Sequence, residues 1–211
     1  MASVAESDLD LATFRLASGS HRDLAHGACV MELVSYVARE PWGDHPQCVS
    51  PAIGTFLRSW NDTLDDDTRQ RLKPYVEKVI GTNTGPADED ARAWLAIDWL
   101  VRTFAPAWLD AANLQEHASK LRGLPALTTS ELANEASEVI HAAGDAAGDA
   151  AWAAARDAAW DAAGDAARDA AWAAARAAAR DALQPTVLML QDSAFGLLDS
   201  MIAVGKVEVA A

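Results

Sequence analysis

The chain has 211 residues, a formal net charge of −14 and an isoelectric point near 4.6, so it is long enough for one large domain and is strongly acidic. This charge disfavours general nucleic-acid binding and attachment to anionic membrane surfaces, since both require a basic surface, and it favours a basic protein partner. No apolar run reaches the roughly 20 residues of a membrane span, no signal peptide is expected, and two cysteines are too few for a disulfide framework, which predicts a cytoplasmic protein.

Two amphipathic helices are predicted in the N-terminal part of the chain. The first lies within residues 22–40, where apolar residues recur at the i, i+3, i+4 spacing of one helix face: Cys29, Val30, Leu33, Val34 and Val37. A proline-rich loop follows. Ser50 and Pro51 then predict a second helix start, because serine is a favourable N-cap and proline suits the first helical position. The apolar stripe of this second helix consists of Ile53, Phe56, Leu57 and Trp60.

The next helix is expected to be capped by Asp66 or Asp67, kinked at Pro74 and ended by Gly81. A further helix begins with acidic residues in its first turn, where the helix dipole favours negative charge. Pro106 is expected to interrupt this helix. Its candidates for burial are Trp94, Leu95, Trp99, Leu100 and Phe104.

A short helix over roughly 113–122 is predicted to end at Gly123, since glycine favours helix C-termini. The alanine-rich tract comes next. Thr128 and Glu131 have the spacing of a capping box that would start its first helix.

From residue 145 to 181 a four-residue word, Asp/Ala-Ala-Ala-x, repeats along the tract. Alanine has the highest helix propensity, but the glycines between 142 and 150 predict a break. An α-helix turns about 100° per residue, so each repeat overshoots a full turn by about 40° and every row of side chains spirals around the helix. Pro185 is expected to start the last helix and Gly205 to stop it.

Together these elements predict an all-α protein, a multi-helix bundle with a long Ala-rich helical element near the C-terminus. We expect a single domain over 1–211. Within it, 1–125 forms an N-terminal helical part, 126–205 contains the Ala-rich helix and the C-terminal helix, and 206–211 is a loose tail.

The fourth position of the repeat carries tryptophan and arginine along a ridge that is a candidate ligand or interaction surface. The ridge consists of Trp152, Arg156, Trp160, Arg168, Trp172 and Arg176. Neighbours four residues apart let a guanidinium stack on an indole, which suits a planar or anionic ligand. The alternative is that the tryptophans are core anchors between small alanines. An ice-binding face fits less well, because a spiralling row offers no flat surface.

Two H-x-x-C pairs near the N-terminus are a candidate zinc site. The pairs are His26 with Cys29 and His45 with Cys48. Together they supply the Cys₂His₂ ligand set of tetrahedral zinc, and no other cofactor is expected. The alternative for Cys29 is a buried free thiol on the apolar face of its helix.

A second cluster gathers residue types that perform acid–base chemistry: His21, Cys29, Glu32, Asp44 and His45. Under the structural alternative, Glu32 accepts hydrogen bonds from loop amides and Asp44 orders a turn. The sequence contains no nucleophile elbow, P-loop, zincin helix or dinucleotide fingerprint, so no residue is assigned a catalytic role.

The stretch GACVMELVSYVAREPWGDHPQCVSPAIGTFLRSWND, residues 27–62, contains G-x-C-x-M-E, then D-x-P-x-C-x-x-P, then W-N-D. In these motifs, and in its Ala-rich tract, the chain resembles a family of all-helical proteins from actinobacteria and actinophages for which no activity is established. The resemblance covers most of the chain, and His26 falls outside its pattern. Its motif positions are Gly27, Cys29, Met31, Glu32, Asp44, Pro46, Cys48, Pro51, Asn61 and Asp62.

The leading functional interpretation is a non-enzymatic binding or interaction protein, a phage or prophage factor acting on a host component. Its acidic surface would meet a basic partner or helix. The first alternative is a metal-dependent enzyme or small-molecule binder that uses the acid–base cluster. The second is a self-assembling structural protein whose copies associate through the Ala-rich helices as a homo-oligomer.

Overall fold

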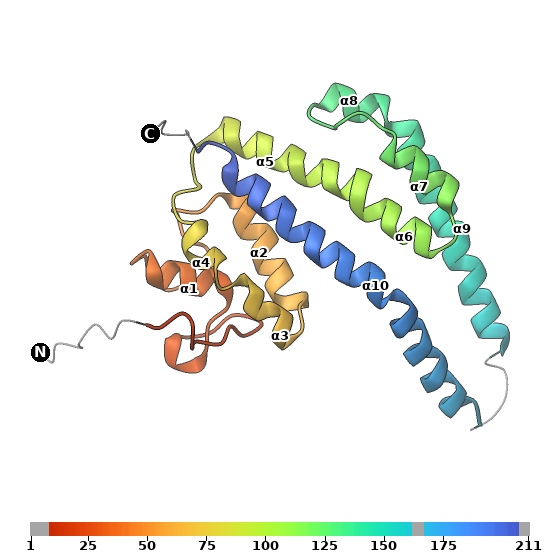
Figure 1. Cartoon of the computed structure of the whole chain (residues 1–211), viewed down its shortest axis with the longest axis horizontal. Coiled ribbons are helices and arrows are strands. Elements are labelled where there is room, and N and C mark those ends of the chain that lie inside the picture. Colours follow the sequence, from red (N-terminus) through yellow and green to blue (C-terminus); the bar gives the residue numbers. More distant parts are fainter. Residues whose placement is uncertain (1–8, 162–166, 207–211) are drawn as a thin grey trace, which may run out of the picture. The chain divides into compact units, whose positions relative to one another are not determined.

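The structure, a computed structural model, describes residues 9–161 and 167–206, without the side chains of residues 154–179. Every regular element of this described part is a helix, which confirms the predicted all-α class (Figure 1). None of the helices described combines the length and the apolar run that crossing a bilayer requires.

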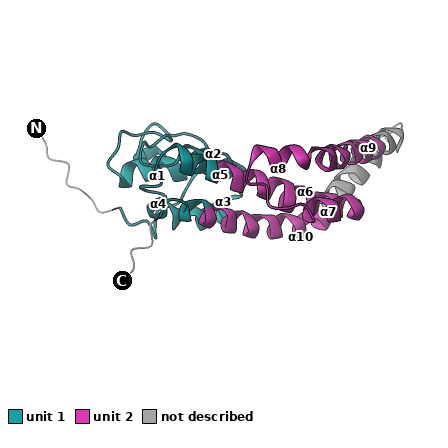
Figure 2. Cartoon of the chain, turned by 90° about the horizontal axis from the view of Figure 1, so that it is seen from above, with its two compact units in different colours: residues 1–92, 201–211 teal, residues 93–200 magenta. Residues whose placement is uncertain are grey.

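The chain divides into two compact units (Figure 2). Unit 1 is Met1–Arg92 with Met201–Ala211, and unit 2 is Ala93–Ser200. Helices α5 (Pro86–Trp99) and α10 (Ala167–Ala203) each contribute residues to both units. The expectation of a single domain stays a prediction.

Unit 1 is built on a short buried helix with two neighbours. Its helices before α5 are η1 (Leu24–His26), α1 (Val30–Val37), α2 (Pro51–Thr63), α3 (Asp66–Arg69), η2 (Gln70–Leu72) and α4 (Tyr75–Lys78). Helix α1 packs against α2 and α4, and every residue of α1 from Val30 to Ser35 is buried. The predicted stripe of α2 is confirmed in part, because Ile53 and Leu57 are buried whereas Phe56 and Trp60 are half-buried.

The predicted start of α2 is confirmed. The Ser50 hydroxyl accepts a hydrogen bond from the Ile53 amide at 3.2 Å, and Pro51 is the first helical residue. The predicted stop at Gly81 is also confirmed. Helix α4 ends at Lys78, a turn follows, and Gly81 ends this turn with a φ of +78°. Such a positive φ favours glycine over other residues.

The start of α3 differs from the prediction. The N-cap is Asp65, not Asp66 or Asp67, and its carboxylate accepts the amides of Asp67 and Thr68 at 3.1 and 2.9 Å. An N-cap needs an extended backbone, and Asp65 has it, with φ −64° and ψ 163°. Asp66 and Asp67 occupy the first turn, where the helix dipole favours their charge.

Arg92 connects α5 to the end of α10 inside unit 1. Its side chain is fully buried. Its Nε and Nη2 donate to the carbonyls of Met201 at 3.0 Å and Val204 at 2.8 Å, and its Nη1 donates to the Glu89 carboxylate at 2.5 Å. The last carbonyls of a helix have no partner within the helix, so Arg92 satisfies groups that α10 leaves open.

Unit 2 contains the remaining helices. They are the rest of α5, the π-helical turn η3 (Leu100–Phe104), α6 (Ala105–Ala111), α7 (Gln115–Arg122), α8 (Ser130–Glu135), α9 (Ser137–Asp161) and α10 up to Ser200. Helix α7 packs against α6 and α9 around a buried cluster of Leu109, Ala118, Leu121 and Ala143. The short helix predicted before Gly123 is therefore confirmed as α7.

Pro106 does not interrupt its helix, contrary to the prediction. The helix continues from α5 through η3 into α6, and the Ala105 amide donates to the Leu100 carbonyl five residues back. In a regular α-helix the proline ring collides with the carbonyl four residues earlier. The wider π-helical turn directly before Pro106 changes that spacing and lets the chain stay helical.

Two predictions for the Ala-rich tract are wrong. The N-cap of α8 is Thr129, one residue after the predicted Thr128, and its hydroxyl accepts the Leu132 amide at 3.4 Å. Helix α9 runs unbroken through Gly144 and Gly148, where a break was predicted. A glycine inside a helix costs only about 1 kcal/mol relative to alanine, and the flanking alanines favour the helix on both sides.

The predicted start of the last helix at Pro185 is also wrong, because Pro185 lies inside α10. Its predicted end is confirmed: α10 ends at Ala203, and Gly205 follows with a φ of +76°.

Candidate functional site

Of the predicted acid–base cluster in unit 1, the structure shows Glu32 in contact with His21 and Cys29, while Asp44 and His45 pair with each other. Glu32 is buried, with 1% of its surface exposed. Its Oε1 accepts the His21 amide at 2.5 Å, while its Oε2 lies 2.9 Å from His21 Nδ1 and 2.8 Å from the Cys29 amide nitrogen. The structural alternative is thereby confirmed for Glu32, since its carboxylate accepts hydrogen bonds from the loop before α1.

Gly27 allows the His21 ring to approach this loop. Gly27 has a φ of +111°, and a Cβ atom there would lie 2.9 Å from His21 Cδ2. A side chain at this position would therefore displace the ring that pairs with Glu32.

The Cys29 thiol has a structural role as the N-cap of α1. Its Sγ accepts the Glu32 amide at 3.4 Å, so the two residues form a reciprocal capping box. Burial raises the pKa of the Cys29 thiol to about 12, and the thiol is therefore protonated at neutral pH. A protonated, buried thiol is a poor nucleophile and a poor metal ligand.

The other predicted zinc ligands have partners of their own. His26 Nδ1 lies 2.6 Å from the Asp23 carboxylate, and His45 Nδ1 lies 2.5 Å from the Asp44 carboxylate. Cys48 is half-buried, and burial raises the pKa of its thiol to about 11. Among the side chains of residues 9–153 and 180–206, no three of His, Cys, Asp or Glu converge as a metal site, so the two pairs are not joined.

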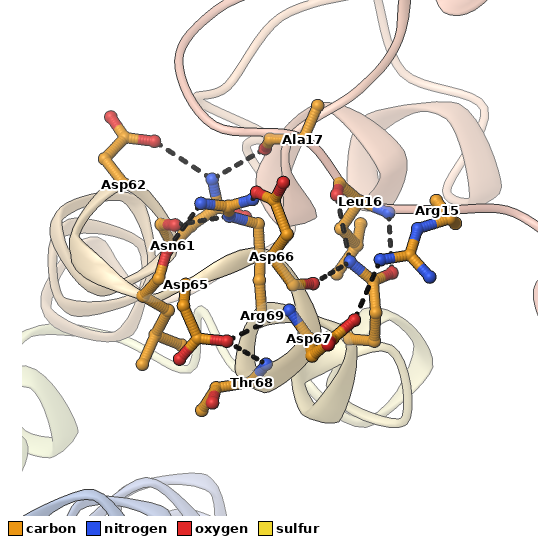
Figure 3. Close-up of polar contacts among 12 residues, drawn as sticks. Arg15, Leu16, Ala17, Asn61, Asp62, Asp65, Asp66, Asp67, Thr68 and Arg69 are labelled. Carbon is orange, nitrogen blue, oxygen red and sulfur yellow. Dashed lines mark hydrogen bonds and ion pairs between the residues drawn. The ribbon is translucent and has the colours of Figure 1, made fainter.

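The W-N-D motif is part of a polar cluster that connects the N-terminal segment to α2 and α3 (Figure 3). Asn61 is fully buried, and its amide donates to the Ala17 carbonyl at 2.9 Å while its Oδ1 accepts the Val30 amide at 3.2 Å. Arg69 Nε donates to the Asn61 carbonyl at 2.8 Å. These bonds give Asn61 a role in folding, because they satisfy the backbone of two separate segments.

The predicted tryptophan–arginine ridge is described only at its first residue. Trp152 is 77% exposed and is therefore not a core anchor, which corrects that alternative at this position. The other five ridge residues have side chains outside the described part of the chain.

Unit 2 contains an apolar groove, a cavity of about 720 Å³ between η3–α6 and α9 that we take as the candidate functional site. Its lining residues are Leu100, Val101, Phe104, Ala105, Trp108, Leu109, Ala112, Leu121, Ile140, Ala143, Gly144, Ala147, Ala150 and Ala151. None of these side chains is polar, apart from the indole nitrogen of Trp108. The groove can therefore bind an apolar surface, and its described lining offers no acid, base or nucleophile for catalysis.

The groove exists because its two walls differ in side-chain size. One wall carries Phe104 and Trp108, whose rings pack edge to face with centroids 6.2 Å apart. After Ala143, the described lining from α9 consists of Gly144, Ala147, Ala150 and Ala151, which are all small. The start of α9 is packed against the Leu109 cluster through Val139 and Ile140, but the following small side chains are too short to fill the space.

The face of α9 that is turned away from the groove is acidic. Residues 130–153, which include α8 and the first part of α9, contain five carboxylates and no lysine or arginine. Asp145 and Asp149 are exposed and four residues apart on one helix, where like charges repel. A positively charged partner would relieve this repulsion.

No protein-family model, no curated protein and no solved structure matches this chain.

Sequence reasoning named Leu100 and Phe104 as candidates for burial but did not identify the groove. Leu100 is 47% exposed, and Trp94, Leu95, Trp99 and Phe104 are only half-buried. One feature of the sequence could have indicated the groove. The segment 94–108 carries large side chains on several faces, whereas the alanine-rich tract carries mostly alanine and cannot fill the space beside them.

Proposed function

We propose that this protein is a non-enzymatic interaction protein whose apolar groove binds a basic amphipathic helix of a partner protein. The observation that carries the proposal is the apolar lining of the groove in a chain with a net charge of −14. An amphipathic helix places apolar side chains in such a groove and its charged face outward. We also propose a cytoplasmic location, which the two free thiols support.

The expectation of a basic partner rests on the net charge of −14 and on the exposed carboxylates of α8 and α9. Their long-range attraction for lysine or arginine side chains would speed association at low ionic strength. The resemblance to actinophage proteins makes a host-cell component the first class of partner to screen.

The test uses a defined peptide in place of the unidentified partner. A synthetic helix of about 18 residues, five turns long, carries leucine along one face and lysine along the other. Its binding to the full chain is measured by fluorescence anisotropy. Two control peptides are a scrambled version that has no apolar face and a version with glutamate in place of lysine. We expect saturable binding of the first peptide alone.

Matched variants of α9 place the binding in the groove. Ala147 and Ala142 are both exposed, but only Ala147 lines the groove. Ala147→Leu fills the space and should weaken binding, whereas Ala142→Leu should leave it unchanged. Equal affinity of both variants, or of the leucine–lysine and scrambled peptides, would refute the proposal.

A second candidate occupant is a small apolar molecule, because the cavity volume lies within the range of small-molecule pockets. A hydrophobic dye that Ala147→Leu displaces, together with no peptide binding, would favour that function. A concentration-dependent increase in mass that Ala147→Leu abolishes would instead favour self-association through the groove.

A further inference from the structure

Unit 1 contains a second, smaller pocket of about 330 Å³ beside the start of α2. Polar and apolar side chains share its lining, among them Arg58, His45, Asn83, Met31 and Val49. None of the lining residues is acidic. This is unusual in a chain with a net charge of −14.

Arg58 is a half-buried cation without a carboxylate partner among the described residues. Its Nη1 donates to the Asp44 carbonyl at 3.0 Å, and its Nη2 donates to the Thr55 hydroxyl at 3.1 Å. A guanidinium has five N–H groups, so two neutral acceptors leave most of its hydrogen-bonding capacity and all of its charge unmatched. A half-buried charge of this kind is costly unless an anion compensates it.

The guanidinium is also held in position. Gly54 lies one helical turn before Arg58, and a Cβ atom there would be 3.2 Å from Arg58 Nη1. The absence of a side chain at Gly54 therefore lets the Arg58 guanidinium lie across α2. A fixed side chain loses little conformational entropy when a ligand binds.

The carboxylates of the adjoining loop are already engaged. Asp44 pairs with His45 at 2.5 Å, and Glu40 accepts the amides of Gln47 and Cys48 at 2.5 and 2.8 Å. Neither carboxylate belongs to the pocket lining or forms an ion pair with Arg58.

We propose that this pocket binds a small organic anion, a carboxylate or phosphate group on a short apolar body, with Arg58 as its counter-charge. The anionic group pairs with the free N–H groups of the guanidinium, as arginine commonly binds planar carboxylates and phosphates. The apolar body contacts Met31 and Val49. The inference is independent of the proposed function, because this pocket belongs to unit 1 and the apolar groove belongs to unit 2.

The test is an NMR titration of the ¹⁵N-labelled full chain with benzoate, using benzamide as a neutral probe of the same shape. We expect saturable shifts of amide signals between residues 45 and 58 with benzoate, and an affinity for benzamide at least about tenfold lower. Inorganic phosphate should compete with benzoate, and added salt should weaken benzoate binding.

Two variants of α2 localise the charge effect without removing Arg58. Thr55 and Ser59 are both exposed on α2, and only Thr55 lines the pocket. Thr55→Glu places a carboxylate beside the guanidinium and should abolish benzoate binding, whereas Ser59→Glu adds the same charge elsewhere and should lower the affinity less than about threefold. Arg58→Gln should also abolish binding while its spectrum remains dispersed.

Three outcomes would overturn the proposal. They are the absence of saturable shifts with benzoate or phosphate, equal affinities for benzoate and benzamide, and equal effects of Thr55→Glu and Ser59→Glu. If Arg58→Gln does not fold, the comparison of the two exposed variants still decides the question.

Discussion

Replacement of Arg92 by methionine should strongly destabilise unit 1. The variant leaves the carbonyls of Met201 and Val204 without their donor and removes the cation paired with Glu89. Removing one partner of a buried pair costs about 3–5 kcal/mol, because the other group stays buried without compensation. At about 2–4 °C per kcal/mol for a chain of this length, the melting temperature should fall by about 6–20 °C.

The effect extends beyond α10 because Glu89 has other partners. Its Oε2 accepts the Ser50 hydroxyl at 2.8 Å and the Ala52 amide at 3.1 Å, so the Arg92–Glu89 pair connects the end of α10 to the start of α2. Arg92→Lys keeps the charge but lacks the fork that reaches two carbonyls and a carboxylate, and it should lose an intermediate amount of stability.

The assay is urea unfolding followed by far-ultraviolet circular dichroism, with native-state hydrogen exchange as a local measurement. Arg15→Met is the matched control, because its ion pair with Asp67 is exposed on both sides and such pairs contribute at most about 1 kcal/mol. Arg92→Met should also reduce protection of the amides near Val204. If Arg92→Met and Arg15→Met lose similar stability, the assigned role of Arg92 is wrong.

Three further predictions concern local features. Cys29→Ser keeps the N-cap and removes a thiol whose pKa is raised to about 12 by burial. A thiol in the unfolded chain loses its proton near pH 9, so deprotonation above that pH favours the unfolded state. In urea titrations the wild type should therefore lose stability relative to the variant as pH rises from about 9 to 12. Pro185→Ala should raise the melting temperature, because a proline inside a helix costs up to about 3 kcal/mol. Gly148→Ala should stabilise α9 by about 0.5–1 kcal/mol in urea unfolding, because a Cβ atom there meets no neighbour. A loss of stability would show that Gly148 is needed for a close contact.

Local chemistry in the sequence was sufficient to locate several helix ends, because a cap is made by groups next to the backbone that it satisfies. The start at Ser50 and Pro51 and the end at Gly123 were predicted correctly, whereas the N-caps of α3 and α8 each lie one residue from the predicted position. Pro106 and Pro185 were predicted wrongly for a different reason. Whether a proline ends a helix depends on whether the backbone can adjust around it, and composition alone does not reveal a π-helical turn.

For the candidate sites, too, contacts between residues close in sequence could be predicted and contacts between distant residues could not. The contact between Glu32 and the loop before α1 could be predicted, because the two segments are close in sequence. The apolar groove and the unmatched charge of Arg58 depend on contacts that the sequence does not rank. Only the structure shows the volume that the small side chains of α9 leave empty and the absence of a carboxylate beside Arg58 among the described residues.

The four-residue repeat explains how far the groove can extend along α9. Gly144, Gly148 and Trp152 occupy the same position of successive repeats, but only Gly144 lines the groove, and Trp152 is largely exposed. This is the expected result of a row that turns away by about 40° at each repeat. Among the side chains that the structure describes, the lining continues instead at the preceding positions, Ala150 and Ala151. From Ile140 to Ala151 the lined face is about 16 Å long, three turns of helix. Along this described length a straight partner helix can therefore place about three turns of apolar side chains in the groove, and a partner that follows one row of the repeat further must wind around α9.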